Sequence, residues 1–294
     1  MKDFDFMAIG DITTDAFIKL ENASIDCDTN KKNCKLCINF GDKVPYENLT
    51  LVHAVGNSPN ASVSAARLGL NSAIITDLGG DSFGKEDVSS LQLNNVDTTF
   101  LKVHKKLESN YHFILRYDAE RTILIKHHKY PYKMPNIGNP KWLYLSSLGE
   151  NSIPYHKDIA KYLKKHPKIK LAFQPGTFQI KLGYKKLKDI YEATELFFCN
   201  KQESQRILNN KKGDIKKLLS GVFKLGPRIV VITDGPNGAF AYDGKEIWKM
   251  PMYPDPAPPV DRTGAGDSFS STFTIAIALG KTIPEALAWG PINS

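Results

Sequence analysis

Short apolar runs alternate with helix-compatible, lysine-rich segments along most of the chain, and this alternation limits the folds it can adopt. The apolar runs lie at residues 7–9, 73–78, 142–146, 169–173, 196–199 and 229–233. The segment 60–70 is typical of a helix that Gly69 ends. Repeated strand–helix order favours a mostly parallel sheet with helices on both faces. The sequence therefore predicts an α/β fold.

Two further segments, 16–50 and 104–130, are typical of exposed β-strands outside this pattern. Strands are expected at 112–115 and 122–125, joined by a turn around Asp118. We therefore predict a large α/β domain from residues 1–15, 51–103 and 131–294, with a small separate β-sheet from the two extra segments.

The composition is that of an ordinary soluble globular protein, with 41% hydrophobic and 24% charged residues in 294. The net charge is +8, and lysines cluster at 161–168 and 185–188. We interpret these clusters as solvated helix faces on a protein with anionic substrates, and we expect no nucleic-acid partner. The first residues are acidic where a signal peptide is basic, and no apolar run approaches the ~20 residues of a membrane span. A cytoplasmic protein without membrane contact is expected.

The four cysteines are expected to be reduced in such a compartment. Cys34 and Cys37 form a Cys-x-x-Cys pair, with Cys27 upstream. A zinc or redox site would use this spacing, but the chain lacks a second pair and nearby histidine ligands, so metal binding is not expected. The role of the three cysteines stays open.

A Gly-Ala-Gly-Asp turn at residues 264–267 leads directly into an apolar, helix-compatible run. Backbone amides at a helix N-terminus attract anions, so Gly264, Ala265, Gly266 and Asp267 would form an anion hole. The carboxylate of Asp267 beside such a hole fits a general base that deprotonates a hydroxyl attacking a phosphate. The alternative is a glycine-rich loop that only caps a helix.

The string DRTGAGDSFSSTF at 261–273 resembles the C-terminal signature of the ribokinase-like (PfkB) sugar and nucleoside kinases. That signature has Asp-Thr-x-Gly-Ala-Gly-Asp, and Arg262 here replaces the Thr. Further matches follow in the family's order. They are Asp15, Asn57 and Asn60, the loop 79–84, Asn200 and Glu203, and the turn 233–238. The resemblance implies a ribokinase-like fold in which the small β-sheet forms a lid over the substrate.

On the acceptor side, the resemblance assigns substrate binding to Asp15, Gly56, Asn57 and Asn60. A carboxylate at a strand end accepts hydrogen bonds from sugar hydroxyls, and asparagine offers both a donor and an acceptor. The family usually has glycine where this chain has Val55, so the loop is expected to differ. Turn formation by Asp15 and helix capping by Asn60 are the structural alternatives.

On the nucleotide side, the resemblance assigns Asn200, Glu203, Thr233, Gly235 and Gly238. Glu203 would hold Mg²⁺, mainly through water, as that ion prefers. An ordinary helix start at Asn200 and an ordinary hairpin turn at 233–238 are the alternatives.

Two other patterns carry no such chemistry. The segment GGDSFGKE at 79–86 approaches a phosphate-binding P-loop, but Glu86 stands where Ser or Thr must reach magnesium. We reject that interpretation. His127 and His128 are neighbours that point to opposite faces of a strand, so a shared metal site is not expected.

The sequence thus predicts transfer of the ATP γ-phosphoryl group, with Mg²⁺, to a hydroxyl of a small-molecule sugar or nucleoside, with Asp267 as the base. Ribose, fructose, keto-acid sugars and nucleosides stay open as acceptors. A catalytically impaired, ligand-binding relative is the alternative, motivated by Val55, Arg262 and the short C-terminus. Pairing of two subunits through the lid follows by analogy.

The chain's end carries one further expectation. Thr282 and Glu285 have capping-box spacing and open a last helix, after which the family normally continues for one more helical segment. The sequence suggests a truncated C-terminus or an open nucleotide pocket.

Overall fold

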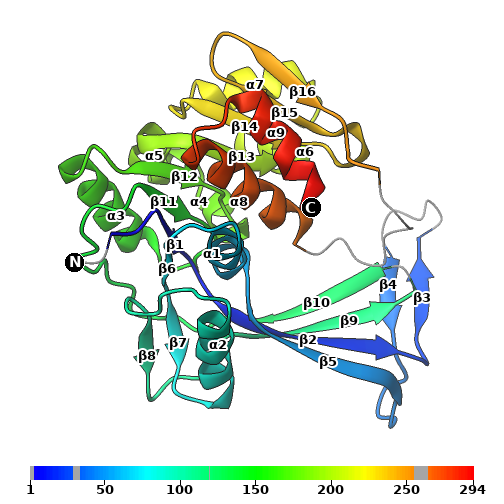
Figure 1. Cartoon of the computed structure of the whole chain (residues 1–294). Helices are drawn as coiled ribbons and strands as arrows, with labels where there is room; N and C mark the ends of the chain where they lie inside the picture. The colour runs from blue at the N-terminus through cyan, green and yellow to red at the C-terminus, as the bar shows by residue number, and fades with distance from the viewer. Residues whose placement is uncertain (1–2, 29–33, 119, 255–263) are drawn as a thin grey trace.

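The main sheet has eight strands. Their bounds are β1 Phe6–Ile9, β6 Ser72–Ile75, β11 Trp142–Leu145, β12 Lys170–Phe173, β13 Thr194–Asn200, β14 Ile229–Thr233, β15 Ala239–Tyr242 and β16 Ile247–Met250. In this computed structural model, which describes residues 3–28, 34–118, 120–254 and 264–294, they pair in the order β16-β15-β14-β13-β12-β11-β1-β6 (Figure 1). All pairings from β6 to β14 are parallel, and β15 and β16 continue the sheet antiparallel.

Helices cover both faces of this sheet, which explains why its inner strands are apolar along their whole length. Strand β1 is buried at every position. Its Met7 and Ile9 pack with the helices of one face and its Phe6 and Ala8 with those of the other. The first face carries α3 Ile153–Lys165, α5 Tyr184–Ala193 and α7 Ile215–Phe223. The second carries α1 Asn57–Arg67, α8 Ala265–Ala278 and α9 Ile283–Ile292.

The remaining helices are short or lie near the sheet's edges. They are α2 Ser82–Leu93, α4 Thr177–Leu182, α6 Lys201–Ile207 and the 3₁₀ turn η1 Gly235–Asn237. Thr282 and Glu285 form the expected capping box at the start of α9, where the Glu285 carboxylate accepts the Thr282 amide at 2.7 Å. Within the described ranges, no helix is both long and apolar enough to cross a bilayer.

A second sheet of four strands extends from the body (Figure 1). Its strands are β2 Thr13–Leu20, β5 Tyr46–Val55, β9 Tyr111–Tyr117 and β10 Glu120–Lys126, and they pair in the order β10-β9-β2-β5. We call this sheet the lid. The strands expected at 112–115 and 122–125 lie in β9 and β10, and Asp118 between them has φ +52°, as a tight turn requires.

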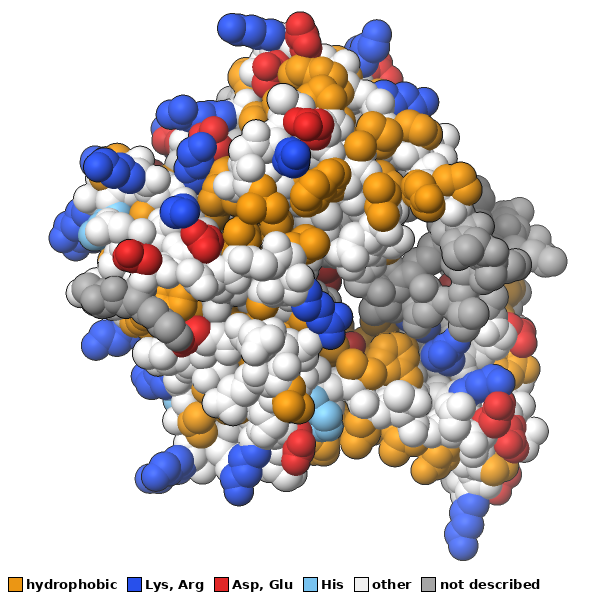
Figure 2. All heavy atoms as spheres, in the orientation of Figure 1, with side chains coloured by type: hydrophobic (Ala, Val, Ile, Leu, Met, Phe, Trp, Pro, Cys, Tyr) orange, Lys and Arg blue, Asp and Glu red, His pale blue; other side chains and the backbone are white. Residues whose placement is uncertain are grey.

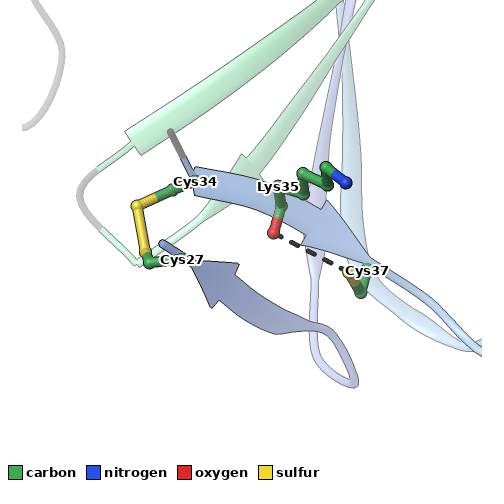
Figure 3. The surroundings of a disulfide bond; sticks show 4 residues. All are labelled: Cys27, Cys34, Lys35 and Cys37. Carbon is green, nitrogen blue, oxygen red and sulfur yellow. Dashed lines mark hydrogen bonds between the residues drawn. A yellow bond between two sulfur atoms is a disulfide. The ribbon is translucent and has the colours of Figure 1, made fainter. Parts of the chain in front are cut away.

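A small hairpin, β3 Ser24–Cys27 and β4 Cys34–Cys37, lies at the far end of the lid (Figure 1). Its register places Cys27 directly opposite Cys34, and the two form a disulfide (Figure 3). Among the described residues, Cys37 and the buried Cys199 are free thiols. The expectation of four reduced cysteines is therefore wrong for this pair, since antiparallel pairing brings the two sulfur atoms together. A short parallel pair, β7 Asp77–Gly79 and β8 Lys102–His104, completes the strands.

Two local predictions need correction. The run 73–78 was expected to be one strand, but the chain changes sheets at Thr76, so β6 belongs to the main sheet and β7 pairs with β8. The helix expected from Asn60 already begins at Asn57. Its end is as predicted, because Gly69 takes φ +90° and donates its amide to the Ala66 carbonyl.

Candidate active site

A cavity of about 760 Å³ lies between the lid and the edge of the main sheet (Figure 2). The lid contributes Thr13, Asp15, Phe17, Val52 and His112, and the body contributes Asn60, Thr233, Gly235, Gly238 and residues 264–269. The cavity therefore collects predicted acceptor, catalytic and nucleotide residues from distant parts of the chain. Ligands of open α/β sheets occupy such crevices beyond the carboxyl ends of the strands.

Asp267 stands in the first turn of α8. Gly264 caps this helix with φ +83°, a left-handed conformation that favours glycine. The amides of the first turn have no partner within their own helix, so Ala265, Gly266 and Asp267 present N–H groups at the cavity. Asp261 and Arg262 of the signature lie outside the described residues.

Three side-chain amides donate hydrogen bonds to the Asp267 carboxylate. Asn57 donates to Oδ1 at 2.8 Å, Gln174 donates to the same oxygen at 3.0 Å, and Asn60 donates to Oδ2 at 3.1 Å. Burial raises the pKa of Asp267, whereas the three donors favour its ionised form and act in the opposite direction. The site therefore holds a partly desolvated carboxylate in a fixed orientation.

Asn57 and Asn60 share one face of α1, at positions i and i+3. The N-cap of this helix is Gly56, so helix capping by Asn60 is ruled out as its structural role. The helix N-terminus instead directs both amides at Asp267 across the site.

The departure at Val55 falls at a position without a positive φ angle in the loop before α1. Its neighbours Ala54 and Gly56 carry the positive φ angles, +56° and +117°. A Cβ on Gly56 would also lie 3.0 Å from the Asp11 carbonyl oxygen. The positive φ angle of Gly56 and its close approach to Asp11 therefore favour glycine at position 56, where the chain has one.

Asp15 lines the cavity from β2, and a chain of histidines stands behind it. Its Oδ1 lies 3.2 Å from His112 Nδ1, and His112 Nε2 lies 3.1 Å from His127 Nε2. His127 Nδ1 in turn lies 3.6 Å from Asp11 Oδ2. Asp15 Oδ1 is buried and accepts no hydrogen bond from the described residues, with His112 Nδ1 as its near neighbour. His128 contacts Glu108 instead and does not join His127.

The loop 79–84 has a structural role, in which Asp81 joins the start of α2 to Ser109. Asp81 caps α2 by accepting the Gly84 amide at 3.0 Å, and it also accepts the Ser109 amide at 2.8 Å. A Cβ on Gly79 would lie 2.3 Å from the backbone of Glu108. This close packing agrees with rejecting a phosphate-binding P-loop there.

Asn200 and Glu203 form a reciprocal capping box at the start of α6. Asn200 Oδ1 accepts the Glu203 amide, and Glu203 Oε2 accepts the Asn200 amide, both at 2.8 Å. Burial raises the pKa of Glu203. The described residues that line the cavity do not include either side chain, but they include Thr233, Gly235 and Gly238. The ion pair from Lys201 to Asp234, at 2.8 Å, ties these two motifs together.

Sequence reasoning did not find Gln174, Tyr144 or His112. Gln174 follows the apolar run 169–173, the same position after a strand that drew attention to Asn200. That signal was available, whereas nothing local marked Tyr144 or His112. Among the described residues, no group of three or more His, Cys, Asp or Glu side chains is arranged to hold a metal ion.

Comparison with known families agrees with this arrangement. The profile described as "pfkB family carbohydrate kinase" matches residues 18–291. The chain belongs to the pfkB family of carbohydrate kinases. The predictions of this family and of the ribokinase-like fold are therefore confirmed.

Curated relatives of this pfkB-family chain are kinases of several substrates. The 5-dehydro-2-deoxygluconokinase of Bacillus subtilis is 27% identical, over 84% of this chain and 82% of the relative. The ribokinase of the same organism is 26% identical over 79% and 76%. The ATP-dependent 6-phosphofructokinase of Thermoanaerobacterium thermosaccharolyticum is 25% identical over 98% and 86%.

Solved structures show the same fold. Arabidopsis thaliana ribokinase complexed with ribose and ATP has a TM-score of 0.81 at 18% identity, covering 99% of this chain and 91% of that one. The Methanocaldococcus jannaschii nucleoside kinase has a TM-score of 0.78 at 18% identity, over 99% and 90%.

Proposed function

We propose that this protein transfers the γ-phosphoryl group of ATP to a hydroxyl of a sugar or nucleoside, with Asp267 as general base. One observation carries the proposal. The Asp267 carboxylate and the first-turn amides of α8 face the same cavity that Asp15 lines from the lid. A base, an anion hole and a hydroxyl-binding carboxylate are the parts that phosphoryl transfer to an alcohol requires.

In the proposed reaction, the acceptor hydroxyl gives its proton to Asp267 as its oxygen bonds to the γ-phosphorus. The bond from that phosphorus to the β-phosphate oxygen breaks, and ADP leaves. The amides of Ala265, Gly266 and Asp267 stabilise the charge on the transferred group, because the N–H groups are held in place by α8. General-base catalysis contributes ~10²–10⁴-fold in rate.

The acceptor would contact Asp15, Gly56, Asn57 and Asn60. Asp15 lines the cavity beside His112, and its carboxylate is the type of group that accepts hydrogen bonds from sugar hydroxyls. Asn60 also lines the cavity while it holds Asp267, so it can contact the acceptor and the base together. The named activities of the relatives make sugars, keto-acid sugars and nucleosides the acceptors to test.

The nucleotide would lie over Thr233, Gly235 and Gly238. Gly235 and Gly238 have φ +51° and +89°, so their turn lets the backbone approach a ligand closely. Glu203, with Asn200, would hold Mg²⁺ mainly through water, and a single carboxylate suits an ion that keeps its hydration shell. Magnesium bound there would neutralise phosphate charge.

Two subunits would pair through the lid. On the face opposite Asp15 and Phe17, Leu49, Leu51, Phe113 and Leu124 are exposed. This apolar surface supports pairing, because contiguous exposed apolar patches often mark interaction sites. Equilibrium sedimentation of the wild-type protein and of Leu51→Glu tests this pairing.

A coupled ADP-release assay with ATP and Mg²⁺ tests the function over ribose, fructose, 5-dehydro-2-deoxygluconate and adenosine. Asp267→Asn should lose at least ~100-fold in turnover on the best acceptor. It should keep the fold, because the Gly264 cap and the start of α8 are untouched. Near-normal turnover of this variant would rule out Asp267 as the base. ATP binding by the wild-type protein without turnover of any acceptor would favour the alternative, a catalytically impaired ligand-binding relative.

A further inference from the structure

Gln174 lies just after β12 and bridges a buried tyrosine to Asp267. Its Nε2 donates to Asp267 Oδ1 at 3.0 Å, and its Oε1 accepts the Tyr144 hydroxyl at 2.5 Å. The described residues that line the cavity include Asp267 but not Gln174 or Tyr144. Tyr144 is buried and Gln174 is half-buried, so Gln174 contacts Asp267 from outside the residues that line the cavity.

The Tyr144 hydroxyl fixes which end of the Gln174 amide faces the base. An amide turned by half a rotation would set Oε1 against the Asp267 carboxylate, and two acceptors would then repel one another. Tyr144 is fully buried in β11, and this burial raises its pKa well above the usual value. At neutral pH the phenol is protonated and can donate its hydrogen to Gln174.

We propose that Gln174, oriented by Tyr144, is a positioning residue that fixes the Asp267 carboxylate and favours its ionised form. The link to catalysis rests on the proposed function, in which Asp267 is the base. The role differs from that of Asn60, which lines the cavity and can turn toward an acceptor. Gln174 has no such place in the lining, and the Tyr144 hydroxyl holds the other end of its amide.

The surroundings of Asp267 leave few other groups to set its protonation. The donors from α1 are the neutral amides of Asn57 and Asn60. Tyr144 from β11 and Glu203 from α6 are the titratable groups whose pKa the charge of Asp267 raises. Glu203 is engaged in its capping box, so the amides make the direct contacts with the base.

Carboxyl-¹³C NMR of protein labelled at aspartate tests the proposal without any substrate. The Asp267 signal is assigned by its absence in Asp267→Asn. Gln174→Met keeps the length of the side chain and removes the donor, so the midpoint of the Asp267 titration should move up by roughly one pH unit. A midpoint that does not move overturns the proposal.

A double variant separates the shift in the Asp267 titration from a loss of stability. Gln174→Met leaves the Tyr144 hydroxyl buried without its acceptor, which costs stability. The double variant Tyr144→Phe/Gln174→Met removes both partners, and it should show the same upward shift with a restored melting temperature.

Kinetics with the best acceptor of the panel supply the link to turnover. Gln174→Met should lower kcat roughly tenfold with little change in acceptor KM. The acidic side of its profile of kcat against pH should move to higher pH. A merely structural loss would lower the rate equally at every pH and overturn the proposal. If the wild-type protein phosphorylates no acceptor, the proposed function fails, but the NMR titration still decides the role of Gln174.

Discussion

The Asp87 carboxylate, buried in α2, accepts a hydrogen bond from the backbone amide of Ala54 at 2.7 Å. The same oxygen accepts the Thr14 hydroxyl at 2.8 Å. Thr14 precedes Asp15 at the start of β2, and Ala54 precedes the loop to Asn57 at the end of β5. One carboxylate thus joins the two lid strands where they leave the body, next to the acceptor side of the cavity.

The buried Asp87 carboxylate makes the free energy of unfolding depend on pH in a defined direction. Burial raises the pKa of Asp87 above its ordinary value of 3.8, so between the two values the folded state binds more protons than the unfolded state. The contribution of Asp87 to stability is largest below pH 3.8 and falls as pH rises toward the raised pKa. In urea unfolding, the advantage of the wild type over Asp87→Asn should therefore shrink from pH 4 toward neutrality.

A neighbour on the same helix supplies the control. Glu86 is exposed, and Glu86→Gln should differ from the wild type by less than about 0.5 kcal/mol at every pH. An advantage of the wild type over Asp87→Asn that grows with pH would contradict the assignment.

The sequence marked individual residues of the candidate site but not the contacts between them. The turn at 264–267 and the carboxylate at Asp15 are local patterns that can be read from neighbouring residues, although Asp15 lies within β2 of the lid and not after a strand of the main sheet. The contacts of Asp267 are different. Asp267 contacts Asn57, Asn60 and Gln174, which are separated from it by 210, 207 and 93 positions in the sequence. No local spacing could therefore reveal these contacts.

The errors in the fold have equally physical causes. The run 73–78 is apolar throughout, and hydrophobic periodicity does not register that the backbone leaves one sheet for another at Thr76. Asn60 before an apolar stretch is a typical N-cap signal, yet Gly56 with its positive φ begins the helix earlier. Whether Cys27 and Cys34 pair depends on the hairpin register, which a cysteine count does not give.

Acceptor affinity should depend on Asp15. Asp15→Ala removes the lid's carboxylate from the cavity, so acceptor binding should weaken roughly ten- to hundredfold, the effect of losing a charged hydrogen-bond partner. ATP binding should change little. Isothermal titration with each ligand separates the two effects, and Asp26→Ala, at an exposed position of β3, is the matched control. Unchanged acceptor affinity in Asp15→Ala would place the acceptor elsewhere.

The disulfide predicts a thiol count. Protein purified without reductant and then denatured should react with two equivalents of a thiol reagent, at Cys37 and Cys199. After reduction it should react with four, the number of cysteines in the chain. Four reactive thiols before reduction would mean that Cys27 and Cys34 stay reduced in the purified protein.

Glu203 carries two assignments that one pair of substitutions can separate. Glu203→Gln keeps an oxygen that can accept the Asn200 amide, so the capping box survives and the free energy of unfolding should change by less than about 0.5 kcal/mol. Glu203→Ala removes the acceptor of the Asn200 amide but leaves the bond from the residue 203 amide to Asn200, and it should cost about 0.5–1.5 kcal/mol. If Glu203 helps to hold Mg²⁺, Glu203→Gln loses the charge that attracts the ion, and half-maximal turnover should require more Mg²⁺. If Glu203 is only a cap, Glu203→Gln should keep the Mg²⁺ dependence of the wild type. Measuring turnover against Mg²⁺ concentration together with chemical unfolding distinguishes the two roles, and an unchanged Mg²⁺ requirement in Glu203→Gln would remove Glu203 from the proposed metal site.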